Sequence, residues 1–209
     1  MTLAWHFTDG MKLRYGTPLV VGQTYRHEGR LMLCESGYHA SERLIDALKY
    51  APGTTLSRVE LSGQRIHNTD KLVAEQRIVL WTLDAHRVIV RWVIWCAYGA
   101  LLADREAGHE PHPDSWHALA VTQRWLDGDA TLDAVRAAAW EARAARAAAW
   151  AARATRTGAA AASAAASAAA WAAGAVRAAG VASAAHSAVR SAQNRKLTAL
   201  VMAEHRRQA

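Results

Sequence analysis

The first 84 residues carry short apolar runs separated by turn residues, a pattern typical of strands in a small sheet. Strands are expected at residues 3–7, 18–25, 30–34, 56–61 and 72–83. In the last of these, residues 78–81 (IVLW) contain no polar side chain, which predicts a central strand buried on both faces. Ser41 can cap one helix that runs to about Tyr50.

From residue 84 onward the apolar positions recur at helical spacing. Helices are expected at residues 84–104, from 114 or 115 to 126, at 131–156 and at 159–192. The first has an apolar stripe through Val88, Trp92 and Trp95, so we expect it to be largely buried, and Asp114 or Ser115 can cap the second. The predicted fold class is α+β, with a small mixed β-sheet module at residues 1–84. An all-α, alanine-rich domain follows at residues 85–209.

Alanine dominates the last third of the chain, which limits how much surface its helices can bury. Residues 131–190 contain 32 alanines in 60 positions, with the unit RAAAW occurring twice. Alanine favours the helix but buries little area, so large side chains must anchor such helices to a partner. Trp140, Trp150 and Trp171 can supply that area. The sequence therefore predicts a homo-oligomer that associates through these tryptophans, with another protein as a possible partner.

Positive charge is concentrated in the same segment. Residues 131–209 hold 11 Lys and Arg against 3 Asp and Glu, whereas residues 1–130 hold 14 against 15. Five arginines between residues 136 and 156 are spaced 7, 3, 7 and 3 apart, so the row winds slowly around the helix. This favours a solvated face over phosphate binding, and nucleic acid is a possible but less favoured partner.

Cysteine use and hydropathy bear on location. Cys34 and Cys96 lie 62 residues apart in apolar segments, with no CxxC motif and no secretory segment before them. We expect reduced, buried thiols in a cytoplasmic protein. The 20 uncharged residues between Arg156 and Arg177 have the length of a membrane span, but they are nearly all Ala, Ser and Gly. Insertion needs larger apolar groups, so no membrane association is expected.

Two segments hold residue types that can bind metals or anions. His109, His112 and His117 lie in a loop with two acidic residues, but their spacing matches no standard site, so a solvated linker is favoured and no metal is expected. Residues 34–41 (CESGYHAS) lead into the first helix. They form either an anion-binding pocket at a helix N-terminus or an ordinary capped turn around a buried Tyr38.

Several longer motifs resemble those of uncharacterised proteins from phages and from bacteria of actinobacterial type. These motifs are WHF, LCESGYHAS, DALKYAPG, RVELSG, DKLVAEQRIVLW and, at residues 192–197, AQNRKL. The resemblance covers nearly the full length, including the Ala/Arg/Trp tail. It implies kinship without an established activity.

The first module also resembles the ADP-ribosyltransferase fold. His6 and Thr8 are similar to the His-x-Thr strand that holds the adenosine ribose of NAD in that fold. Residues 37–41 and the helix ending at Tyr50 look like its second signature, in which a tyrosine stacks on nicotinamide. The third signature of that fold is a carboxylate before the last strands, and Asp70 or Glu75 could occupy that position. The region is shorter than that fold usually is, at about 85 residues, and the acid has no flanking motif.

Two functions follow as expectations. The first is a non-catalytic module that binds a ligand or partner and self-associates through the alanine-rich helices, with no cofactor. The second is an NAD-dependent ADP-ribosyltransferase with NAD as its cofactor. The candidate catalytic residues are His6, Tyr38, Asp70 and Glu75, and the candidate ligand-binding residues are His6, Thr8, Tyr38, His39, Ser41 and Tyr50. We expect His6, Tyr38 and Asp70 to meet at one cleft.

Overall fold

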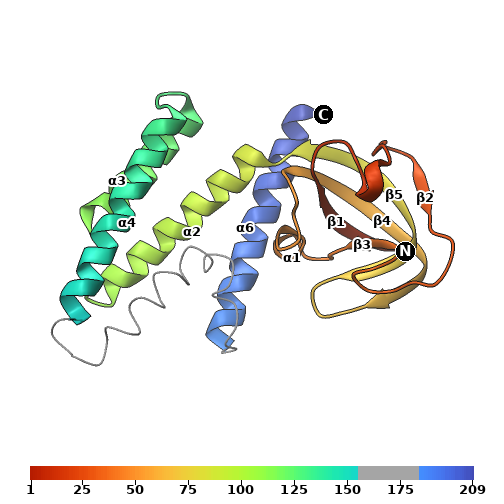
Figure 1. The fold of residues 1–209 in the computed structure, drawn as a ribbon, viewed down its shortest axis with the longest axis horizontal. Coiled ribbons are helices and arrows are strands. Elements are labelled where there is room, and N and C mark those ends of the chain that lie inside the picture. Colours follow the sequence, from red (N-terminus) through yellow and green to blue (C-terminus); the bar gives the residue numbers. More distant parts are fainter. Residues whose placement is uncertain (155–183) are drawn as a thin grey trace. The chain divides into compact units, whose positions relative to one another are not determined.

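The computed structural model describes residues 1–154 and 184–209. The chain divides into two compact units, of which the first comprises Met1–Ile89 and Val189–Ala209 and the second Val90–Ala188. The first unit contains the sheet and the second contains helices (Figure 1). This confirms the predicted α+β class. The division differs from the expected one because the C-terminal helix belongs to the sheet unit.

The sheet is built on two long strands of equal length. β4 (Thr55–His67) and β5 (Leu72–Asp84) form a hairpin, and β1 (Thr2–Thr8) pairs with the free edge of β4. On its other edge, β5 pairs first with β3 (Tyr38–Ala40) and further along with β2 (Thr24–Arg26). Every one of these pairings is antiparallel.

The sheet curls until its two sides meet. The residue after β3, Ser41, exchanges two backbone hydrogen bonds with Trp5 of β1, with N···O distances of 2.8 and 3.0 Å. Register shifts in the β4–β5 ladder, between Arg58 and Val59 and again between Ser62 and Arg65, add local bend and twist. The curled sheet encloses a buried core that includes Ala4, Val59, Leu61, Leu72 and Val79.

The last helix completes this unit. α6 (Ala184–Gln208) buries Leu197 and Val201 fully, and the His205 ring stacks on Trp81 at a centroid distance of 4.1 Å. The Asn194 side-chain oxygen accepts a hydrogen bond from the Ile45 N–H in α1 (Leu44–Leu48), at 3.0 Å. Asn194 therefore satisfies an orphan donor in the first turn of α1. Ser41, the expected cap, pairs with β1 instead.

Two expected strands differ from the structure. Of the expected strand at 18–25, only residues 24 and 25 belong to a strand, β2. The Tyr25 hydroxyl accepts from the Val20 N–H and donates to the Pro18 carbonyl, both at 2.8 Å, which satisfies these groups without a strand partner. Residues 30–34 form no strand: Met32 and Ser36 bond to each other in a tight turn instead. A 3-10 turn, η1 (Arg14–Gly16), precedes this region. The central strand β5 is also less buried than expected, since Leu80 is exposed.

The helical unit contains α2 (His86–Glu106, shared with the first unit), α3 (Pro113–Asp127) and α4 (Leu132–Ala154), of which α3 and α4 pack against each other. Contrary to expectation, α2 is not largely buried, since Trp95 is 42% and Tyr98 51% exposed. His112, not Asp114 or Ser115, caps α3, because its Nδ1 accepts from the Asp114 N–H and Pro113 occupies the first turn.

The alanine-rich segment is described only in part. α4 begins at the expected place, with the Thr131 hydroxyl accepting from the Ala134 N–H. The expected helix at residues 159–192 lies mostly outside the described residues, and the described α6 runs past residue 192 to Gln208. No helix in the described ranges is long and apolar enough to cross a membrane.

Candidate functional site

A cavity of about 710 Å³ opens in the sheet unit, within the size range of small-molecule sites. β1 contributes Trp5, His6 and Phe7 to its wall, and β3 contributes Tyr38 and His39. The connection between β1 and β3, the end of α1 and two positions on or beside β5 complete the wall. The curled sheet therefore brings residues from distant parts of the chain around one hollow.

Cationic side chains outnumber anionic ones in this wall. Arg14, Lys71 and Arg77 line the cavity, and Glu35 is the one carboxylate among the described residues of its wall. Such a wall produces a positive potential, which a low-dielectric hollow strengthens. The cavity therefore favours ligands that carry negative charge.

Arg77 is the most unusual member of the wall. It lies on β5 opposite Tyr25 and Leu61, its residue is 3% exposed, and its Nε has no hydrogen-bond partner among the described residues. The guanidinium lies over the Tyr38 ring, 4.9 Å from the ring centroid. Burial lowers the pKa of Arg77 to about 10. A buried cation without a carboxylate is costly, and an anionic ligand would offset that cost.

Burial lowers the pKa of two of the three histidines that line the cavity, His6 and His39. His39 Nε2 accepts from the Cys34 N–H at 2.8 Å while its Nδ1 is 3.1 Å from the Gly37 carbonyl, an arrangement that suits the Nδ1–H tautomer. Burial, followed by Lys71 and Arg14, outweighs the Gly37 hydrogen bond and lowers the pKa of His39. Burial and Arg77 lower the pKa of His6 well below 6.5, and its Nδ1 has no partner in the described chain.

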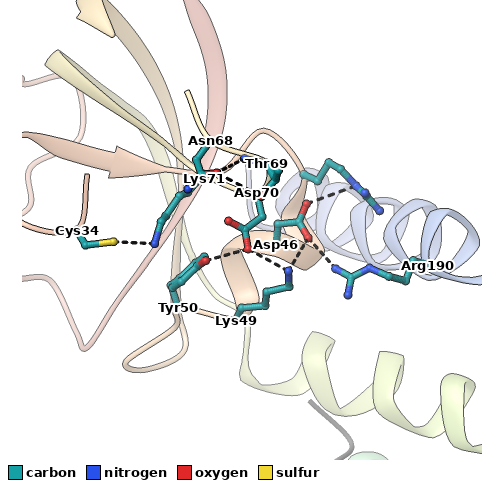
Figure 2. Close-up of polar contacts among 10 residues, drawn as sticks. Cys34, Asp46, Lys49, Tyr50, Asn68, Thr69, Asp70, Lys71 and Arg190 are labelled. Atoms are coloured by element: carbon teal, nitrogen blue, oxygen red, sulfur yellow. Dashed lines mark hydrogen bonds and ion pairs between the residues drawn. The ribbon is translucent and has the colours of Figure 1, made fainter. Parts of the chain in front are cut away.

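A chain of polar contacts runs from this wall to α6 (Figure 2). The Tyr50 hydroxyl donates to Asp70 Oδ2 at 2.8 Å, and Lys49 Nζ lies 3.0 Å from the same oxygen and 3.5 Å from Asp46 Oδ1. Arg190 of α6 binds that Asp46 oxygen at 2.7 Å. Burial alone would raise the pKa of Asp70, but the hydrogen bonds from Tyr50 and Lys49 hold it below its usual value.

The structure brings together most of the ligand-binding residues expected from the sequence. The cavity is lined by His6, Tyr38, His39, Ser41 and Tyr50. Asp70 lies behind Tyr50 and lines a separate hollow of about 90 Å³, so it does not meet His6 and Tyr38 in the cavity itself.

Thr8 and Glu75 have other roles. The Thr8 hydroxyl donates to the Gly10 carbonyl at 2.8 Å, and Glu75 Oε2 accepts from the Gln64 N–H at 3.1 Å in the β4–β5 hairpin. Neither lines the cavity. Arg14, Lys71 and Arg77 line the cavity but were not predicted from the sequence to lie at a binding site. The available signal was Arg77, a charged residue within the most apolar strand of the sheet.

The remaining candidates are placed as follows. Cys34 is exposed, not buried as expected, and Cys96 is half-buried, which raises the pKa of its thiol to about 11. His112 caps α3, and the described residues contain no group of three His, Cys, Asp or Glu able to hold a metal ion. Trp140 is 71% exposed on α4. The side chains of Trp150 and Trp171 lie outside the described part of the chain.

Comparison with known proteins identifies a similar domain but no activity. No curated protein and no solved structure matches the chain. Residues 2–91, which include every residue that lines the cavity, are similar to a domain of unknown function, DUF7666.

Proposed function

We propose that the sheet unit is a ligand-binding module that takes a small anionic molecule into the cavity described above. The observation that carries this proposal is Arg77, a cation buried in the wall without a carboxylate partner among the described residues. Arg14 and Lys71 add positive charge to the same hollow. Guanidinium groups bind carboxylates and phosphates in a fixed, bidentate geometry, so both anion types suit the site.

A binding experiment tests the proposal directly. Inorganic phosphate, pyrophosphate and acetate would be titrated into the full chain by calorimetry, with thermal shift as a second readout. A ligand at 100 times its Kd stabilises the folded state by about 2.7 kcal/mol. We expect binding by at least one of these anions and its loss in Arg77→Met. Arg65→Met is the matched control, because Arg65 is an exposed arginine on β4. Absence of binding by all three anions would contradict the proposal.

A second candidate is NAD-dependent ADP-ribosyl transfer, which the placement of His6 and Tyr38 in one cavity favours. The carboxylate that such a reaction needs beside the nicotinamide is less well matched, since Lys49 and Tyr50 engage Asp70 behind the wall. Incubation of the full chain with NAD, with nicotinamide release as the readout, separates the two candidates. Release that disappears in Tyr38→Ala would favour the transferase. No release and no thermal shift with NAD would remove it.

We also propose that the protein self-associates through its alanine-rich helices. Trp140 on α4 is mostly exposed, and an exposed tryptophan of this kind can bury its ring in a partner surface. A second copy of this chain is the proposed partner, in a phage or bacterial accessory role that the sequence resemblance suggests.

A further inference from the structure

Cys34 occupies an unusual position at the edge of the cavity. It is a non-glycine residue with φ of 71°, at the tip of the turn that Met32 and Ser36 close by two backbone hydrogen bonds. A left-handed conformation at a non-glycine residue is uncommon and is often found where geometry serves a function. The residue is exposed and also lines the cavity. Solvent and small solutes can therefore reach its thiol.

The surrounding residues hold Cys34 in place through its backbone. Its N–H donates to His39 Nε2 at 2.8 Å, and its carbonyl accepts from Arg14 at 3.4 Å. Gly37 fixes the end of the same turn with φ of 97°, where an added Cβ would lie 2.6 Å from a Val73 methyl carbon. The strained turn is thus anchored on both sides of the cysteine.

Lys71 is the direct partner of the thiol. Its Nζ lies 2.9 Å from Cys34 Sγ, within hydrogen-bond distance, as Figure 2 shows. The same Nζ is 4.5 Å from the Tyr50 ring centroid, which holds the ammonium over the ring face. The hydrogen bond to Cys34 is the largest cause that raises the pKa of Lys71, so the lysine remains a cation.

An independent feature of the same cavity indicates that it receives a reactant from solution. Arg77 is buried in the wall with an unpartnered Nε in the described structure, and His6 Nδ1 is likewise unpartnered. Unpartnered polar side chains in the wall of a cavity that also holds an accessible thiol can bind a small polar molecule. The thiol, its ammonium partner and these unpartnered polar atoms line the same cavity.

We propose that Cys34 is a site of oxidation by small hydroperoxides and that Lys71 positions and stabilises the reacting sulfur. The sulfur attacks one peroxide oxygen, the O–O bond breaks, and the second oxygen leaves with the thiol proton as water when the peroxide is hydrogen peroxide. Sulfur is oxidised by two electrons to a sulfenic acid and the peroxide is reduced. The ammonium, 2.9 Å from the sulfur, stabilises the negative charge that develops on the departing oxygen as the O–O bond breaks.

Cys96 provides an internal comparison. It lies on α2, it is half-buried, and burial raises the pKa of its thiol to about 11. A thiol in that state reacts slowly with peroxide, because the thiolate is the nucleophile. The two cysteines of one chain therefore differ in both access and electrostatic surroundings.

The test uses the full, reduced chain treated with hydrogen peroxide in the presence of dimedone, which traps sulfenic acids. Peptide mapping by mass spectrometry gives the labelling rate of each cysteine in the wild type, and Cys96→Ser isolates the rate at Cys34. We expect labelling at Cys34 to be about tenfold or more faster than at Cys96. Lys71→Met should slow labelling of Cys34 by about tenfold and Lys71→Arg should restore much of the rate.

Circular dichroism of each variant checks that the chain is folded, and Arg65→Met serves as a control for the loss of one exposed cation. Equal labelling of the two cysteines, or an unchanged rate in folded Lys71→Met, would overturn the proposal. The oxidation requires no bound phosphate, pyrophosphate or acetate in the cavity. A failure of the anion-binding proposal would therefore show in calorimetry alone, whereas a failure of this one would show in labelling alone.

Discussion

Replacing Arg77 with methionine should stabilise the protein while it abolishes anion binding. Most substitutions of buried residues are destabilising, so an increase is a distinctive outcome. Arg77 is 3% exposed, and its guanidinium has the Tyr38 ring as its neighbour instead of a carboxylate. Methionine fills much of the same space, adapts to irregular gaps and carries no charge.

The magnitude follows from the pKa of the guanidinium. Burial lowers that pKa from its usual value to about 10, which corresponds to about 3 kcal/mol of cost for a charged Arg77 in the folded state. Because the folded pKa is the lower one, this cost is fully present below pH 10 and disappears only as pH rises past the unfolded value. Methionine removes the cost but loses the contact with Tyr38, worth about 0.5–2 kcal/mol. The expected net gain is about 1–2 kcal/mol.

The assay must report on the sheet unit, since the helical unit can unfold separately. Hydrogen exchange of β4 and β5 peptides, read by mass spectrometry at near-neutral pH, gives the opening free energy of this unit. Arg65→Met, at an exposed position on β4, should change it by less than about 0.5 kcal/mol. Faster exchange in Arg77→Met together with unchanged anion affinity would refute the reasoning, because Arg77 would then be a structural residue.

Four further outcomes are expected. Asn194→Ala should lower the free energy of unfolding of the sheet unit by about 1 kcal/mol, since it removes the hydrogen bond to the first turn of α1, and an unchanged urea midpoint would show that this cap contributes nothing. Because His6 and His39 both have lowered pKa values in the folded state, the unfolded state binds more protons, so stability should fall as pH drops below 6.5, and His39→Gln should remove the His39 share of that dependence in urea titrations. Gly37→Ala should destabilise the unit by more than about 1 kcal/mol, because it combines a positive φ with a clash against Val73, and a wild-type melting temperature would contradict this. Light scattering after size exclusion should give a mass above 22.6 kDa that falls in Trp140→Ala, whereas a concentration-independent monomer would exclude self-association.

The sequence alone determined the elements whose signals are local. β1, β5 and the helices α3 and α4 lie where the periodicity of apolar residues placed them, because that periodicity and the capping residues act within a few positions. The ring and imidazole groups of the site, Tyr38 and His39 among them, were also recognisable from their own segment. Strands that depend on distant partners were less predictable, as residues 18–25 and 30–34 show.

Only the tertiary structure decided which residues share the cavity and what covers the sheet. Curling of the sheet brings Trp5 against Ser41 and places Arg77 of β5 beside Tyr38, contacts that no local pattern specifies. The return of α6 joins Asn194 to Ile45 and Arg190 to Asp46 across more than 140 residues. The physical reason is that long-range contacts depend on the shape of the assembled core, whereas helix and strand periodicity depend only on neighbours along the chain.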